Sequence, residues 1–159
     1  MPEITTRLAT PEDAAAMCCL LNTIIAKGGS TAYTTPFDVD RMTSNNINHP
    51  RGISCIVALD GALIVGFQWL KRGDPNQEGD GKLPDDWASI ASFVADGQQG
   101  KGIGGRLFAA TLVAAQDANI SNIDATIRTY NTSGLAYYSR LGFVDYRETD
   151  TAISKKYAV

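Results

Sequence analysis

Glycines crowd one short segment in the middle of the chain. Residues 100–105 include four of them, between a strand-forming run that ends at Val94 and a helical apolar pattern around Leu107. Because glycine lacks a Cβ, such a backbone lets a ligand approach closely, and the start of the next helix offers unpaired N–H groups and a positive dipole end. This combination is typical of a diphosphate site, with a merely flexible turn as the alternative.

Two familiar kinds of diphosphate site fit this segment poorly. Its glycines match the G-x-G-x-x-G spacing of dinucleotide sites, and Asp124 lies 19 residues beyond Gly105, where a ribose-binding acid is expected. However, five residues separate Val94 from Gly100, only 54 residues follow the motif, and Asp124 comes early in its predicted strand. A P-loop needs Ser or Thr directly after its lysine, whereas glycine follows Lys101.

The segment resembles the turn that binds the nucleotide in the GNAT superfamily of acyl-CoA-dependent N-acyltransferases. In that family a strand ending in valine is followed by a few polar residues and the pattern Q/R-x-x-G-x-G/A. Here Gln99, Gly102 and Gly104 match the pattern, and Val94 ends the strand.

A second pattern of the same family lies farther along the chain. Asn131, Tyr138 and the pair Gly142-Phe143 match N-x6-Y-x3-G-F, so that the resemblance covers nearly the whole chain. It implies a single N-acetyltransferase-like domain over residues 1–159 that uses acetyl-CoA as cosubstrate and no metal. It also implies acetyl transfer to the primary amine of a small molecule by direct attack in a ternary complex. A catalytically inactive CoA-binding sensor or interaction module on the same fold is the alternative.

The resemblance implies roles for individual residues. The end of the strand at Phe93 and Val94 would pair its backbone with the pantetheine arm and the acetyl carbonyl, and an N–H group near Val94 would bind the oxyanion. Asn131 would bind a pantetheine amide and cap the next helix, with capping alone as the alternative. The residues whose N–H groups would hold the CoA diphosphate are Gln99, Gly100, Lys101, Gly102, Ile103, Gly104 and Gly105.

Tyr138 occupies the position of the general acid in this resemblance. A phenol with a pKa of about 10 is a neutral donor at pH 7, and it is about 2 kcal/mol short as an acid for a thiolate whose thiol has a pKa of about 8.5. Hydrogen bonding to the sulfur would narrow that gap. The alternative is that Tyr138 only packs in the core, as we expect for Tyr137.

The general base is the point at which the chain departs from the family pattern. Many family members carry a glutamate in the strand before the glycine turn, whereas residues 87–93 contain no carboxylate. Four residues are candidates in its place. Ser89 or Ser92 could orient a water that carries the proton away, or Asp85 or Asp86 could act from the entrance of the strand.

Selection of the acceptor should depend on residues beside the acetyl group. We expect them in the first helix, in the loop with Tyr33 and Phe37, and in a polar insertion from Lys71 to Asp86. Acidic residues outnumber basic ones in that insertion, which would attract a cationic acceptor, although a solvated loop explains them as well. The N-terminal region is also faintly similar to phosphinothricin-type acetyltransferases at Ile24-Ile25 and over residues 32–36, although those enzymes carry glutamate where Thr35 stands. This resemblance points to a small amine or an amino-acid-like acceptor.

The rest of the pattern predicts an α/β (α+β) fold that positions these residues. We expect a central mixed, mostly antiparallel sheet of roughly six to seven strands, flanked by about four helices. The hairpin is predicted by Asp60-Gly61 between two apolar runs. The predicted strands are 4–8, 54–59, 62–70, 87–94, 123–127, 143–147 and 152–157. The predicted helices run from Pro11 to Lys27, from Asp38 toward Asn48, around Leu107 to Ala115, and from Ser133 to Leu141.

Composition bounds the partners and the compartment. With 159 residues and a net charge of -3, the chain has the size of one domain and no basic footprint, so we expect no nucleic-acid partner. It contains no apolar run of roughly 18 residues and no signal-peptide pattern, so we expect a cytoplasmic protein without a membrane partner. A homodimer is compatible with the sequence.

Cysteine and histidine offer little chemistry. Cys18, Cys19 and Cys55 fall on apolar patterns and are expected to be buried. His49 is the single histidine of the sequence, so a His/Cys metal cluster is not expected.

Overall fold

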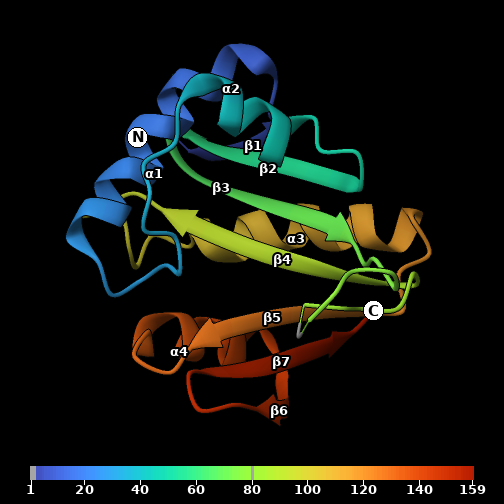
Figure 1. The fold of residues 1–159 in the computed structure, drawn as a ribbon. Helices are drawn as coiled ribbons and strands as arrows, with labels where there is room; N and C mark the ends of the chain where they lie inside the picture. The colour runs from blue at the N-terminus through green and yellow to red at the C-terminus, as the bar shows by residue number, and fades with distance from the viewer. Residues whose placement is uncertain (1–2, 80) are drawn as a thin grey trace.

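The computed structural model describes residues 3–79 and 81–159, in which seven strands form one mixed sheet (Figure 1). The strand order is β1-β2-β3-β4-β5-β7-β6, and neighbouring strands are antiparallel except β4 and β5, which run parallel. The strands are β1 (Ile4–Leu8), β2 (Gly52–Asp60), β3 (Leu63–Arg72), β4 (Trp87–Val94), β5 (Asn122–Arg128), β6 (Val144–Glu148) and β7 (Ala152–Ala158).

Helices cover the two faces of this sheet unequally. On one face, α1 and α2 pack over the half that contains β1 to β4, while α3 and α4 lie on the opposite face (Figure 1). Among the residues described, no helix covers β5, β7 and β6 on the α1–α2 face. The helices are α1 (Ala14–Lys27), preceded by a 3-10 turn (Pro11–Asp13), α2 (Val39–Met42), continued by a π-helical turn (Thr43–Ile47), α3 (Ile103–Asp117) and α4 (Thr132–Leu141).

Local sequence signals set the ends of these helices. The Asp38 carboxylate accepts the N–H of Arg41 at 2.7 Å and begins α2, as predicted. Asn131 begins α4 in the same way by accepting the N–H of Gly134 at 3.0 Å. Gly28 ends α1 with a φ of 74°, a conformation that glycine adopts without strain.

The predicted fold class is confirmed, and every predicted strand and helix forms. The hairpin strands are longer than predicted, because pairing of β2 with β3 continues past an irregularity near Ser54 to Gly52 and Lys71. A mostly antiparallel sheet is not the doubly wound parallel sheet of a dinucleotide-binding fold. The dinucleotide alternative therefore does not fit this chain.

The burial of the cysteines is confirmed for two of the three. Cys18 and Cys55 are buried, but Cys19 is exposed, so its predicted burial was wrong. α1 buries the face that holds Met17, Cys18, Leu20 and Leu21, and the helical rotation of about 100° per residue turns position 19 away from it.

The parallel pair β4–β5 stays together over only three residues of each strand. Pairing runs from Trp87 and Asn122 to Ser89 and Asp124, and beyond that level the strands separate (Figure 1). The last five residues of β4 therefore lack a neighbour on the side of β5, and their backbone polar groups on that side have no sheet partner.

Candidate active site

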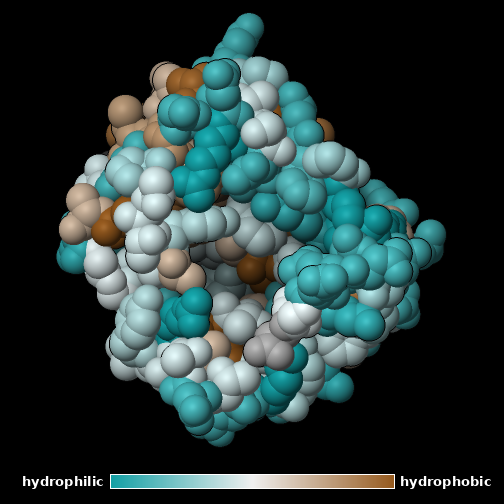
Figure 2. Space-filling model, in the orientation of Figure 1, coloured by the Kyte–Doolittle hydropathy of each residue, from teal (hydrophilic) through white to brown (hydrophobic). Residues whose placement is uncertain are grey.

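A cavity of about 1100 Å³ fills the space where β4 and β5 separate. It is lined by the second half of β4, by β5 from Asp124 onward, by the glycine segment, by the end of α1 with its following loop, and by one face of α4. Figure 2 shows the hollow in the middle of the α1–α2 face. The separation of the two strands thus leaves a deep opening in the sheet.

The glycine segment presents a row of free backbone donors to this cavity. Within residues 3–79 and 81–159, the N–H groups of residues 99–105 have no intrachain acceptor, and the first bond of α3 runs from the Arg106 N–H to the Gly102 carbonyl at 3.1 Å. Free amides at the start of a 15-residue helix bind anions well. Of the predicted diphosphate-binding residues, those that line the cavity are Gln99, Gly100, Gly102, Ile103, Gly104 and Gly105.

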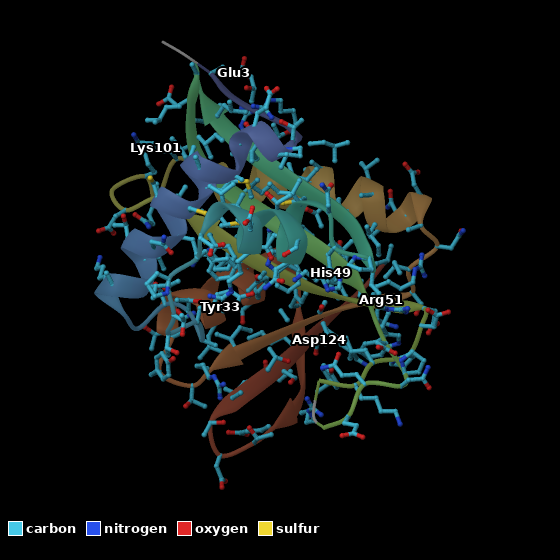
Figure 3. The ribbon with its side chains drawn as sticks, turned by 45° about the horizontal axis from the view of Figure 1, so that its top comes forward. Glu3, Tyr33, His49, Arg51, Lys101 and Asp124 are labelled. Atoms are coloured by element: carbon cyan, nitrogen blue, oxygen red, sulfur yellow. The ribbon has the colours of Figure 1, made fainter. Side chains whose placement is uncertain are left out.

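Lys101 is the member of the segment that lies outside the cavity. Its Nζ donates to Gln98 Oε1 at 3.0 Å, and its exposed side chain lies at the edge of the molecule (Figure 3). Only its backbone N–H is in a position to serve the predicted anion site.

Different structural constraints act on the glycine positions of this segment. Gly100 and Gly102 have φ values of 82° and 77°, in the region that favours glycine. A Cβ on Gly104 would lie 2.5 Å from Cε1 of Tyr137, so this position is small because α4 packs against it. A Cβ on Gly105 would meet no protein atom within 4 Å.

The strand end of β4 turns alternate residues toward the cavity. Because the Trp87 carbonyl and the Ala95 N–H both bond to the β3 side, Phe93 also directs its backbone toward β3. Ser92 and Val94 direct their N–H and C=O groups toward the separated β5. Backbone pairing with a ligand, predicted around Phe93 and Val94, is thus available at Val94 and Ser92, while Phe93 contributes its buried ring to the cavity wall.

Tyr138 brings a buried hydroxyl to the cavity from α4. The residue is 6% exposed, its ring packs against Phe143, and its Oη lies 2.8 Å from Ser92 Oγ. Gln68 Nε2 donates to the same Ser92 oxygen at 2.7 Å. Burial raises the pKa of Tyr138 above that of a free phenol, so the hydroxyl stays protonated at neutral pH.

Tyr137 also lines the cavity, although core packing was expected for it. Its Oη donates to the Gly104 carbonyl at 2.7 Å and accepts from Gln68 Nε2 at 3.1 Å. These bonds tie α4 to the first turn of α3, so Tyr137 holds the glycine segment in place.

Asn131 lines the cavity with a side chain whose polar atoms already have partners. Oδ1 accepts from Gly134 N and Ser133 Oγ, and Nδ2 donates to the Ser30 carbonyl at 3.3 Å. Capping explains the Oδ1 bonds by itself, and a pantetheine amide would have to compete with these partners.

The four candidates for the general base separate by position. Ser89 and Ser92 line the cavity. Asp85 forms an exposed ion pair with Arg51 at 3.0 Å, and Asp86 accepts from a serine at the start of β5. Both acids precede β4 and do not line the cavity, whose β4 wall begins at Ser89, so the structure does not bring them to it.

Asp124 is a carboxylate of the cavity wall that the sequence reading did not assign to catalysis. It is 7% exposed and lies at the last level at which β5 pairs with β4. It accepts from Tyr146 Oη at 2.5 Å and from Thr126 Oγ1 at 3.0 Å. Burial raises its pKa, against the effect of these two bonds and of the charge of Arg147. The sequence feature that could have identified it is an acidic residue within an otherwise apolar predicted strand.

The predicted acceptor-selecting residues are only partly brought together. Tyr33 lines the cavity, whereas Phe37 is buried beneath it, with ring centroids 5.0 Å apart. The described residues of the insertion, 71–79 and 81–86, do not line the main cavity. They help to form a smaller recess of about 340 Å³ next to it.

The described residues contain neither a metal-binding cluster nor a membrane-spanning helix. Within them, no group of three or more His, Cys, Asp or Glu side chains could hold a metal ion. No helix in the same part of the chain is long and apolar enough to cross a membrane.

Three solved structures share this fold at low sequence identity. A GCN5-related N-acetyltransferase from Kribbella flavida has a TM-score of 0.81 at 19% identity and covers 98% of each chain. A phosphinothricin acetyltransferase from Sinorhizobium meliloti in complex with AcCoA has a TM-score of 0.81 at 17% identity, over 100% of this chain and 89% of that one. A ribosomal-protein-alanine N-acetyltransferase from Brucella melitensis has a TM-score of 0.80 at 18% identity, over 98% and 99% of the two chains.

Sequence comparison gives the family itself. A search of curated proteins finds no significant match. The model of the acetyltransferase (GNAT) family, however, matches residues 24–143 of the 159, which include both the glycine segment and the Asn131 to Phe143 pattern. The chain therefore belongs to the acetyltransferase (GNAT) family.

Proposed function

We propose that this protein transfers the acetyl group of acetyl-CoA to the primary amine of a small molecule within one ternary complex. The observation that carries the proposal is the run of unbonded N–H groups at residues 99–105, which opens onto the unpaired end of β4. From there the cavity leads past Tyr138 to Asp124. The AcCoA complex of the similar Sinorhizobium meliloti enzyme supports the same cosubstrate here.

The backbone does most of the binding in this proposal. N–H groups of residues 99–105, with the positive end of the α3 dipole, would hold the diphosphate of CoA. Ser92 and the carbonyl of Val94 would pair with the pantetheine arm as a strand pairs with its neighbour, which leaves the Val94 N–H for the acetyl oxygen. The thioester would then lie in the gap beside Tyr138.

Transfer requires a neutral amine, an oxyanion donor and a proton for the sulfur. The amine nitrogen attacks the carbonyl carbon and forms the C–N bond, while the Val94 N–H stabilises the negative oxygen. The C–S bond then breaks, and Tyr138 Oη donates its proton to the departing sulfur. The new amide nitrogen loses its proton to solvent, which also returns a proton to Tyr138.

Direct attack is favoured over a covalent acetyl-enzyme. Within the described residues, no cysteine lines the cavity. Burial raises the pKa of Cys55 to about 12, which keeps its thiol protonated and unreactive.

Thiol release from acetyl-CoA, measured with pools of amino acids, polyamines and aminoglycosides and followed by mass spectrometry of the products, tests this function. We expect release that depends on one pool, an acetylated amine, and intersecting initial-velocity lines. Tight CoA binding with no turnover on any pool would instead favour the inactive sensor. A cytoplasmic location, a homodimer and the absence of a nucleic-acid partner stay predictions from the sequence.

A further inference from the structure

Three polar residues lie at one level of the sheet, across three neighbouring strands. Lys71 of β3 pairs with Ser89 of β4, and Ser89 pairs with Asp124 of β5. Residues that pair in register point to the same face, which here is the face toward α1 and α2. Adjacent strands are about 4.8 Å apart, so the backbones of Lys71 and Asp124 are about 10 Å apart.

Asp124 is the negative end of this row. Within the described chain no lysine, arginine or histidine nitrogen lies within 4 Å of its carboxylate, which is 7% exposed at the wall of the main cavity. Its two bonds come from neutral hydroxyls, and the charge of Arg147 offsets the effect of burial only in part. A buried carboxylate in this situation is stabilised by a cation that enters the cavity, and the ammonium form of an amine supplies one. This ammonium loses one proton to solvent before its nitrogen attacks the thioester.

Lys71 is the positive end of the row, and its Nζ lacks an ionic partner among the residues described. The Nζ lies 3.8 Å from the centroid of the Trp69 ring, and the nearest acceptor, Asn46 Oδ1, is 3.4 Å away. Burial lowers the pKa of Lys71 to about 8, so the side chain is still mainly protonated at pH 7. An anion bound here would compensate a half-buried charge.

The recess around Lys71 carries an excess of positive charge. Arg51 and Arg72 line it with Lys71, and Asp74 contributes a carboxylate that accepts a backbone N–H. His49 also lines the recess, but burial and the charges of Lys71 and Arg51 lower its pKa, so it adds no charge at pH 7. Figure 3 shows His49 and Arg51 on the segment that enters β2, on the same side of the molecule as Asp124. Arg51 is paired with Asp85, and the guanidinium of Arg72 donates to the backbone carbonyls of Asp85 and Ala118. Lys71 is therefore the cation best placed to bind a ligand.

Ser89 connects the two spaces, because it lines both the main cavity and the recess. A molecule in the main cavity with its nitrogen at Asp124 can therefore extend over Ser89 toward Lys71. The separation of about 10 Å between the two backbones is short enough for one small molecule to reach both side chains.

We propose that the acceptor is a small amine that also carries an acidic group, with its amine bound at Asp124 and its acidic group bound at Lys71. This inference rests on the proposed acetyl transfer and names the substrate class for it. It also replaces the expectation that acids of the insertion attract a cationic acceptor, since the part of the insertion nearest the cavity is basic.

The test compares free L-amino acids with their carboxamides as acceptors, since each pair has the same carbon skeleton and differs in the acidic group. The wild-type protein should show a kcat/KM at least tenfold higher for the acids, and Lys71→Met should bring the ratio close to one. Lys71→Arg, which restores the charge, should keep the preference.

Lys156 offers a matched control. It lies at the same level of the sheet, opposite Asp124 on β7, but outside the recess. Lys156→Met should therefore leave the preference intact. Asp124→Asn should raise KM for acids and carboxamides alike, because both bind to this carboxylate through their α-amine. The carboxamides have the less basic α-amine and hence more of the neutral nucleophile at pH 7, so a preference for the acids cannot come from amine basicity.

Equal use of acids and carboxamides by the wild-type protein would overturn this inference, and so would an equal loss of the preference in the Lys71→Met and Lys156→Met variants. Turnover of polyamines or aminoglycosides with no turnover of amino acids would overturn it while leaving the proposed acetyl transfer intact. Absence of turnover with every amine would contradict the proposed function itself.

Discussion

The side chain of Tyr138 combines a structural role, through its ring, with a proposed chemical role, through its hydroxyl. Its ring packs in the core with Phe143, while its hydroxyl is fixed by Ser92 at the cavity wall. The two interpretations of this residue, packing and proton donation, are therefore compatible. Tyr137, its neighbour on α4, instead binds the Gly104 carbonyl and holds the glycine segment.

The two tyrosines should respond differently to loss of the hydroxyl. Tyr138→Phe should lower kcat by about 100-fold or more, the usual contribution of a general acid, and leave the Kd for acetyl-CoA nearly unchanged. Tyr137→Phe is the matched control, and its main effect should be weaker acetyl-CoA binding. Steady-state kinetics and calorimetry measure both, and an unchanged kcat in Tyr138→Phe would remove the residue from this role.

The pH profile of the wild-type protein adds a check on the same residue. Because burial raises the pKa of Tyr138, its donor form persists to higher pH than that of a free phenol, whose pKa is about 10. Loss of kcat in a basic limb well below pH 10 would have to come from another group.

Some residues of the candidate site could be predicted from the spacing of motifs in the sequence, whereas others are brought together only by the pairing of strands. Tyr138 and the glycine segment belong to short local patterns, so the sequence predicts them directly. Asp124 and Lys71 are far apart in the chain and share a site only through their common neighbour Ser89. No local pattern contains that information.

Among the elements, the junction between the glycine segment and α3 sets the anion site. Its position depends on α4, because the Tyr137 ring fills the space that a Cβ on Gly104 would need. Gly102 has a positive φ, so a Gly102→Val substitution would strain the backbone as well as obstruct a ligand. Gly105 avoids this ambiguity, since it lies in the helix and faces open space.

Alanine substitutions at Gly104 and Gly105 distinguish the effect of core packing on stability from the effect of backbone contact on ligand binding. Gly104→Ala should lower the free energy of unfolding by about 1–3 kcal/mol, because its Cβ overlaps the Tyr137 ring. Gly105→Ala should raise it by up to about 1 kcal/mol, because alanine favours a helix, and should nevertheless weaken acetyl-CoA binding. Urea unfolding and calorimetry measure the two effects. Acetyl-CoA binding of wild-type strength in a stable Gly105→Ala protein would contradict a close approach of the diphosphate at this residue.

For the whole molecule, the separation of β4 from β5 is the decisive feature. Periodicity and turn signals located each strand to within a few residues, because these signals are local. They did not determine the sheet order, in which β7 lies between β5 and β6, or the level at which β4 and β5 part. Both depend on contacts between segments that are distant in sequence, and the second creates the cavity.

Residue-resolved amide hydrogen exchange, with and without acetyl-CoA, tests the central claim most directly. The N–H groups of residues 99–105 have no intrachain acceptor in the part of the chain that the structure describes, so they should exchange quickly in the free protein. Acetyl-CoA should slow exchange at these residues and at Val94, with little change at the α3 residues beyond the first turn. Binding of acetyl-CoA that leaves exchange at residues 99–105 unaltered would contradict the proposed site.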